Sequence, residues 1–128
     1  VLILVIGSAL KAVSDAQERL GLRFLEEVRT APRYRLWTVD GGFAALVEVE
    51  SGGVAVTGEL VEAPDSLLEA ILASEPRGVT QAPVELADGR WVNAATADPQ
   101  VIGGRGQDIS AWGGFAAFHQ SQRGSTSA

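Results

Sequence analysis

The chain has 128 residues, 46% of them hydrophobic and 20% charged, which suffices for one compact core without a metal ion or disulfide. It contains no cysteine, and this excludes disulfides, thiolate nucleophiles, cysteine-ligated zinc and iron–sulfur clusters. The formal net charge is −6, and Lys11 is the single lysine. Binding along a phosphate backbone needs clustered basic side chains, so nucleic acid is not an expected partner.

The N-terminal segment predicts a buried strand. Residues 1–6 are continuously apolar and stop at a glycine, so a loop over residues 7–10 should follow at the carboxyl end of this strand. The run is too short to cross a bilayer and has no basic flank or cleavage site, so we expect neither a signal peptide nor membrane contact, and a cytoplasmic location. Ser14 and Gln17 have capping-box spacing, which predicts a short helix that ends at Gly21.

Runs of β-branched and alternating residues predict the strands of a sheet. These runs are residues 24–29, 34–39, 43–49, 54–62, 84–86 and 91–94. The glycine-rich Ser51-Gly52-Gly53 predicts that 43–49 and 54–62 form a hairpin. Asp88-Gly89 predicts a second hairpin between the last two runs.

Two further helices are expected. Asp65 is placed to cap a short amphipathic helix that ends before Pro76, which leaves Glu75 just past the helix end. Asp108 is placed to cap a final helix. That helix would carry Ile109, Trp112, Phe115 and Phe118.

The remaining segments predict irregular structure. Residues 98–107 are rich in glycine and polar side chains, and the run 103–106 within them predicts a flexible loop. Residues 121–128 predict a disordered tail. Hairpins mixed with single helices favour one α+β domain over residues 1–120, a mixed sheet with partial barrel closure and two or three helices.

Four segments resemble, in order, stretches of the C-terminal domain of allophanate hydrolases. They are residues 30–37 (TAPRYRLW), 58–64 (GELVEAP), 85–92 (ELADGRWV) and 108–115 (DISAWGGF). Their counterparts in the family read TAP-x-YRLY, GEVWEVP, ELADGRWV and DITAFGGWRAY. The resemblance implies a γ-glutamylcyclotransferase-like fold whose pocket surrounds the glycine loop after the first strand, here Gly7-Ser8-Ala9-Leu10. Backbone N–H groups of such a loop could hold a carboxylate or carbonyl oxygen, although an ordinary tight turn is the alternative.

The resemblance also implies where chemistry has changed. The family loop usually reads GAHLSG, and its histidine would carry a proton during decarboxylation of a carboxylated carbamate, but Ala9 stands at that position here. The sole histidine, His119, is expected on the solvated exit of the last helix. The family's WRAY is replaced by Phe115-Ala116-Ala117-Phe118. These changes favour a more apolar ligand beside Trp112 and Phe115, unless the aromatic rings only pack the core.

Cyclotransferases of this fold use a glutamate after the helix that follows a strand, and Glu75 occupies roughly that position by its spacing from Pro64. An apolar wall would raise the pKa of its carboxyl and make it a usable base, whereas a solvated side chain is the alternative. Tyr34 is a second candidate for catalysis. Arg35 would grip a substrate carboxylate or simply face solvent.

These residues leave the enzymatic status open and favour a stand-alone small-molecule enzyme with lyase-like or cyclising chemistry. One alternative is a noncatalytic binding or assembly module for an amidase, and another is an allophanate-pathway decarboxylase. No cofactor and no metal are expected. A paired sheet edge would make a homodimer.

Overall fold

The computed structural model describes residues 1–126, without the side chains of residues 72 and 123–126. The strands are β1 (Leu2–Val5), β2 (Arg23–Arg29), β3 (Tyr34–Val39), β4 (Phe43–Glu48), β5 (Thr57–Glu62), β6 (Val79–Glu85), β7 (Trp91–Ala97) and β8 (Gly106–Asp108). The α-helices are α1 (Ala16–Leu20), α2 (Asp65–Ser74), α3 (Pro99–Ile102) and α4 (Phe115–Thr126). Two 3₁₀ turns are η1 (Gly103–Arg105) and η2 (Ser110–Trp112).

All eight strands of the described chain belong to one mixed sheet. Its order is β2-β5-β1-β7-β4-β3-β8, with β6 paired to β7 outside this path. The strand β1 runs antiparallel to β5 and parallel to β7, and β4 also runs parallel to β7. The predicted α+β mixed sheet is thus confirmed, but the sheet is not closed. The described residues form four α-helices rather than two or three.

The apolar first strand lies at the centre of the molecule, as its sequence predicts. Ile3, Leu4 and Val5 are all buried, and β1 has a neighbouring strand on each side. Continuous apolar sequence is typical of such a strand, since neither face meets water. The burial of β1 fixes the position of the loop that follows it.

The predicted hairpin of 43–49 with 54–62 is wrong. The strand β4 pairs with β3, and β5 pairs with β1 and β2. The chain between β4 and β5 instead crosses the start of β3, where the Val54 N–H donates to the Tyr34 carbonyl at 2.8 Å. A glycine turn shows that the chain bends, but it does not say which strand becomes the next partner.

The second predicted hairpin is confirmed. Strands β6 and β7 pair antiparallel, with Val79 opposite Ala97 at one end and Glu85 opposite Trp91 at the other. At the turn, Gly89 has a φ of 92°, which favours glycine, and its N–H donates to the Leu86 carbonyl at 2.9 Å. Here the turn residues and the strand partners are adjacent in sequence, so the local pattern is sufficient.

The C-terminal quarter is more regular than its composition indicates. Residues 98–107 contain α3, η1 and the start of β8, and the predicted flexible loop 103–106 is η1 and the first residue of β8. The strand β8 pairs with β3, and both Nε and Nη2 of Arg105 donate to the Asp40 carboxylate at 2.8 Å. Glycine content therefore marks close turns here, not missing structure.

The last helix begins later than predicted. Asp108 accepts a hydrogen bond from the Ser110 N–H at 2.9 Å, but this turn leads only into η2. Gly113, with a φ of 77°, then separates η2 from α4. Likewise, Asp65 is the first residue of α2 and makes no capping hydrogen bond, with Pro64 at the cap position.

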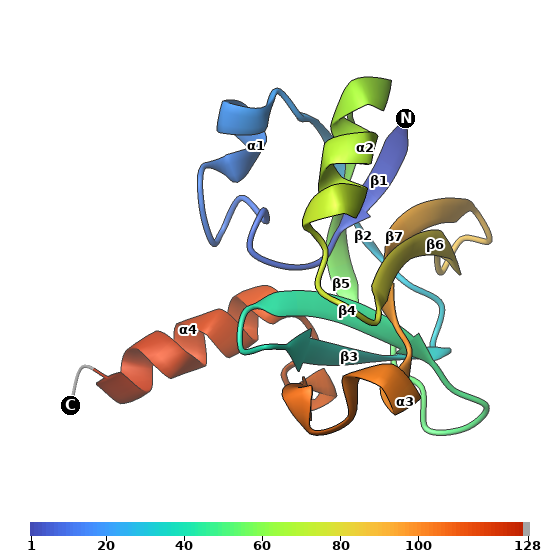
Figure 1. Ribbon diagram of the computed structural model, residues 1–128, viewed down its shortest axis with the longest axis vertical. Coiled ribbons are helices and arrows are strands. Elements are labelled where there is room, and N and C mark those ends of the chain that lie inside the picture. The colour runs from blue at the N-terminus through green and yellow to red at the C-terminus, as the bar shows by residue number, and fades with distance from the viewer. Residues whose placement is uncertain (127–128) are drawn as a thin grey trace.

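Figure 1 shows α1 and α2 near β1 on one side of the molecule, and α4 extending away from the strands towards the C-terminus. The tail was predicted to be disordered from residue 121, but α4 continues to Thr126. Residues 127 and 128 of that tail lie outside the described residues.

Candidate functional site

The 7–10 loop, made of Gly7, Ser8, Ala9 and Leu10, is a tight turn closed by its own backbone. The Leu10 N–H donates to the Gly7 carbonyl at 3.0 Å, and Gln17 Nε2 donates to the Ala9 carbonyl at 3.0 Å. A Cβ on Gly7 would lie 2.9 Å from the Cβ of Ala44, so only glycine fits without displacing its neighbour. The loop is thus held from β4 on one side and from α1 on the other.

One cavity, here named the Glu75 cavity, lies against this loop and has a volume of about 210 Å³. Its polar lining comes from Ser8, Ser74, Glu75 and Gln81. Most of the remaining lining is apolar and includes Leu20, Leu22, Phe43 and Ile71. The end of α2 places Glu75 here, because Glu75 is the extended residue that terminates that helix.

The Glu75 carboxyl is half-buried and only partly satisfied. Its Oε1 accepts a hydrogen bond from Gln81 Nε2 at 2.8 Å, while its Oε2 is buried and has no partner among the described residues. Burial raises the pKa of this carboxyl above its ordinary value of 4.5, and the Gln81 hydrogen bond offsets part of that rise. A carboxyl whose pKa is raised in this way binds a proton more readily than an exposed one, which suits an acid–base role.

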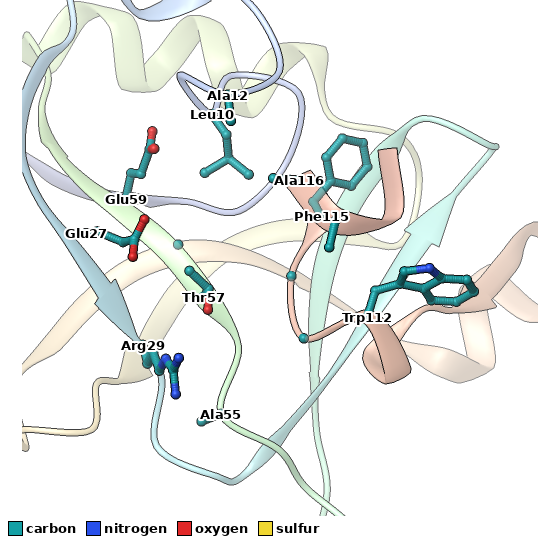
Figure 2. A pocket seen from close by; sticks show the side chains of 14 residues that line it. Leu10, Ala12, Glu27, Arg29, Ala55, Thr57, Glu59, Trp112, Phe115 and Ala116 are labelled. Atoms are coloured by element: carbon teal, nitrogen blue, oxygen red, sulfur yellow. The ribbon is translucent and has the colours of Figure 1, made fainter. Parts of the chain in front are cut away.

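A second cavity, here named the Glu59 cavity, has a volume of about 390 Å³ and borders the far end of the same loop. Figure 2 shows Glu27 and Glu59 on neighbouring strands on one side, with Phe115 and Trp112 on the opposite side. Leu10 also lines this cavity. Of the predicted binding residues, the structure therefore places Gly7, Ser8 and Ala9 with Glu75, and Leu10, Trp112 and Phe115 elsewhere.

Glu59 is a buried carboxyl, with 9% of the residue exposed. Its Oε1 accepts hydrogen bonds from Gln17 Nε2 at 2.6 Å and from the Lys11 N–H at 2.9 Å. Sequence reasoning did not single out Glu59, although it lies within the GELVEAP segment that resembles the family. A charged residue amid the apolar run of β5 was the signal that could have identified it.

Two predicted site residues lie in neither cavity. Tyr34 is 2% exposed and packs in the core, where its hydroxyl accepts a hydrogen bond from the Glu85 N–H at 2.8 Å. Arg35 donates to Asp108 and to the Gly52 carbonyl, each at 3.0 Å. Both side chains are engaged within the fold, so we do not retain them as catalytic or binding residues.

The aromatic residues at the start of α4 have two roles. Phe115 and Phe118 are both buried, and Phe118 meets the Trp112 ring edge-to-face at 5.3 Å. Phe118 packs in the core and lines neither cavity. Phe115 packs in the core and also lines the Glu59 cavity. His119 stacks on Phe115, with ring centroids 6.1 Å apart, and also lines neither cavity.

Two absences apply to the described part of the chain. It holds no group of three His, Asp or Glu side chains arranged to bind a metal ion. None of its helices is long and apolar enough to cross a membrane.

The fold and these cavities can now be set beside known proteins. Residues 1–120 match the family described as the allophanate hydrolase C-terminal domain. The chain belongs to this family. No curated protein matches this family member in sequence.

Solved structures agree with the assignment to the allophanate hydrolase C-terminal family. The urea amidolyase of Kluyveromyces lactis matches with a TM-score of 0.83 at 21% identity, over 96% of this chain but 8% of the amidolyase chain. A protein specific to uropathogenic E. coli matches with a TM-score of 0.79 at 27% identity, over 94% of both chains. A mouse AIG2-like protein matches with a TM-score of 0.61 at 18% identity, over 80% of this chain and 82% of the mouse chain. The fold is therefore γ-glutamylcyclotransferase-like, as the resemblance predicted.

Proposed function

We propose that this domain is a small-molecule enzyme in which Glu75 transfers a proton beside the 7–10 loop. The observation that carries the proposal is the Glu75 carboxyl itself. It is half-buried, its pKa is raised by burial, and one oxygen has no partner among the described residues although it lies in a cavity with that loop. A carboxyl in such surroundings is suited to general acid–base catalysis.

The geometry supports cyclising chemistry on a substrate that carries an ammonium and a carbonyl. The Glu75 carboxylate takes a proton from the ammonium, and the freed amine attacks the carbonyl carbon of the same molecule. A new C–N bond forms while the carbonyl electrons move to oxygen. Backbone N–H groups of the 7–10 loop would stabilise that oxyanion. When the oxyanion collapses, the bond from the carbonyl carbon to the leaving group breaks, the proton on Glu75 passes to the leaving group, and the ring nitrogen gives up its second proton to water.

The walls of the Glu75 cavity favour a small and mostly apolar substrate. Drug-sized ligands occupy cavities of about 300–1,000 Å³, and this one measures about 210 Å³. Leu20, Leu22 and Ile71 contribute apolar surface, and Ala9 replaces the histidine that the family carries in the loop. A dianion such as a carboxylated carbamate would find few partners there.

The test is a panel of amino-acid amides and esters whose amine can close a five- or six-membered lactam, with the cyclic product and the leaving group followed by mass spectrometry. We expect Glu75→Gln to lower kcat by at least about 100-fold, the usual contribution of a general base. The matched control is Glu69→Gln, an exposed carboxyl on the same helix, which should retain activity. Equal activity of the two variants would show that Glu75 is not the base.

A noncatalytic module for an amidase is the second candidate. It is supported by the match to 8% of the much longer urea amidolyase chain and by the replacement of the family's histidine with Ala9. Co-purification with an amidase, together with no turnover of the panel, would favour it. Faster carbon dioxide release from carboxylated carbamate, lost in Glu75→Gln, would instead favour a decarboxylase.

A further inference from the structure

The Glu59 cavity contains an ordered pattern of charge that the proposed reaction does not use. On adjacent antiparallel strands, Glu27 lies opposite Glu59, and Arg29 lies opposite Thr57. All four residues line the cavity. The strand register therefore places two carboxyl groups at one level of the cavity and a guanidinium with a hydroxyl at the next level.

The charges at these two levels are not neutralised within the described chain. Carboxylates directly opposite each other on paired strands repel unless a cation lies between them. Glu59 receives two N–H donors on Oε1, but neither Glu27 nor Glu59 forms an ion pair with a described residue. Arg29 likewise has no carboxylate partner among the described residues, in contrast to Arg33, Arg35 and Arg90.

The opposite wall is apolar. Phe115, Ala116 and Trp112 line the cavity on the side opposite the charged strands, and Leu10 lines it from the loop. Trp112 is 39% exposed, so part of its indole surface remains accessible. A hydrocarbon or aromatic group could bury this surface.

We propose that the Glu59 cavity is a second ligand site, separate from the Glu75 cavity, which binds an extended zwitterion the size of a dipeptide. Its ammonium lies between Glu27 and Glu59, its carboxylate meets Arg29 and Thr57, and its side chain packs on Trp112 and Phe115. Two residues along a strand span roughly 7 Å. Two extended peptide units span about the same length, whereas the ammonium and carboxylate of a single amino acid are too close together.

The test is isothermal titration calorimetry of the full chain with glycyl-phenylalanine. Each charged end is removed in turn by using the N-acetyl dipeptide and the dipeptide amide. We expect each blocked form to bind at least about tenfold more weakly, because a charge-assisted hydrogen bond is lost. Glycyl-phenylalanine that does not bind, or blocked forms that bind equally well, would overturn the proposal.

Variants of Glu27 and Arg29 test which end of the dipeptide each side chain binds. Glu27→Gln should weaken binding of the free dipeptide but not of its N-acetyl form, and Arg29→Gln should weaken the free dipeptide but not the amide. The matched control is Glu26→Gln, because Glu26 lies on the opposite face of β2, where it pairs with Arg90. Loss of binding in this control as large as in Glu27→Gln would contradict the site.

Binding also separates this site from the proposed reaction. Glu75→Gln should leave the affinity for glycyl-phenylalanine unchanged, even if it abolishes turnover. Binding that is lost in Glu75→Gln and kept in Glu27→Gln would place the dipeptide in the other cavity and overturn the inference.

Discussion

Glu75 destabilises the fold whenever it is charged. Its pKa is raised in the folded chain because the carboxyl is half-buried, whereas in the unfolded chain the pKa returns to about 4.5. Between these two values the folded state holds more protons than the unfolded state. The free energy of unfolding therefore falls as the pH rises through this window, and it stays lower above the folded-state pKa.

Replacing Glu75 with glutamine should therefore stabilise the protein at neutral pH and do so less at acidic pH. We expect a gain of up to about 1 kcal/mol at pH 7, limited because half of the group faces solvent. The measurement is urea unfolding at several pH values from 4 to 8, with Glu69→Gln as the control for loss of an exposed charge. A gain for Glu75→Gln that does not grow with pH would contradict the assigned cause.

At the scale of residues, the position of Glu75 beside a cavity could be predicted from the sequence, whereas the position of Tyr34 in the core could not. The position of Glu75 could be predicted from two local features of the sequence, the end of a helix and the spacing from a segment that resembles the family. The role of Tyr34 depends on the Glu85 N–H, which is 51 residues away in sequence. Glu27 and Arg29 carried no local signal, because the strand β5 with which they pair is also distant along the chain.

The segment between β4 and β5 is held by contact with backbone. Gly53 passes so close to the residues before β3 that an added Cβ would lie 2.6 Å from the Pro32 carbonyl oxygen and 2.7 Å from the Arg33 carbonyl carbon. Backbone atoms cannot move aside as a flexible side chain does. This crossing brings the chain from β4 to β5 on the far side of β1.

We expect Gly53→Ala to destabilise the protein by about 2 kcal/mol or more, because the crossing segments must separate. The control is Gly42→Ala, where an added Cβ meets nothing within 4 Å. Both variants are compared by urea unfolding. A loss in Gly53→Ala that does not exceed the loss in Gly42→Ala would show that the crossing tolerates a side chain.

At the scale of elements, the strands were predicted more reliably than their partners. The residue runs identified most strands and both longer helices, since periodicity and turn residues act locally. Neighbour order was correct for β6 with β7, which share one turn, and wrong for β4 with β5. Short β8 escaped detection because its pairing with β3, not its own composition, makes it a strand.

The whole molecule depends on three central strands. The strand β5 pairs on both sides, β1 lies between β5 and β7, and β7 has three partners. By contrast, β8 has three residues and lies at the end of the sheet. Separating β1, β5 or β7 from the sheet breaks the hydrogen bonds to at least two neighbouring strands at once. The terminal strand β8 can separate by losing only its hydrogen bonds to β3.

Hydrogen exchange should therefore be slowest for hydrogen-bonded amides of β1, β5 and β7, and much faster for those of β8. We expect the central amides to exchange only through global unfolding, so that their opening free energy equals the stability from denaturant unfolding. Native-state exchange followed by NMR measures both. Equal protection of β8 and β1 would mean that the sheet opens as one unit.

The position of β1 also has a consequence for synthesis on the ribosome. This strand is made before its partners, because Leu4 pairs with Leu60 on one side and with Ala94 on the other. Until both partners have been made, an apolar segment with unpaired backbone remains exposed to other chains and to chaperones. The same central strand that stabilises the finished domain thus makes the unfinished one prone to aggregate.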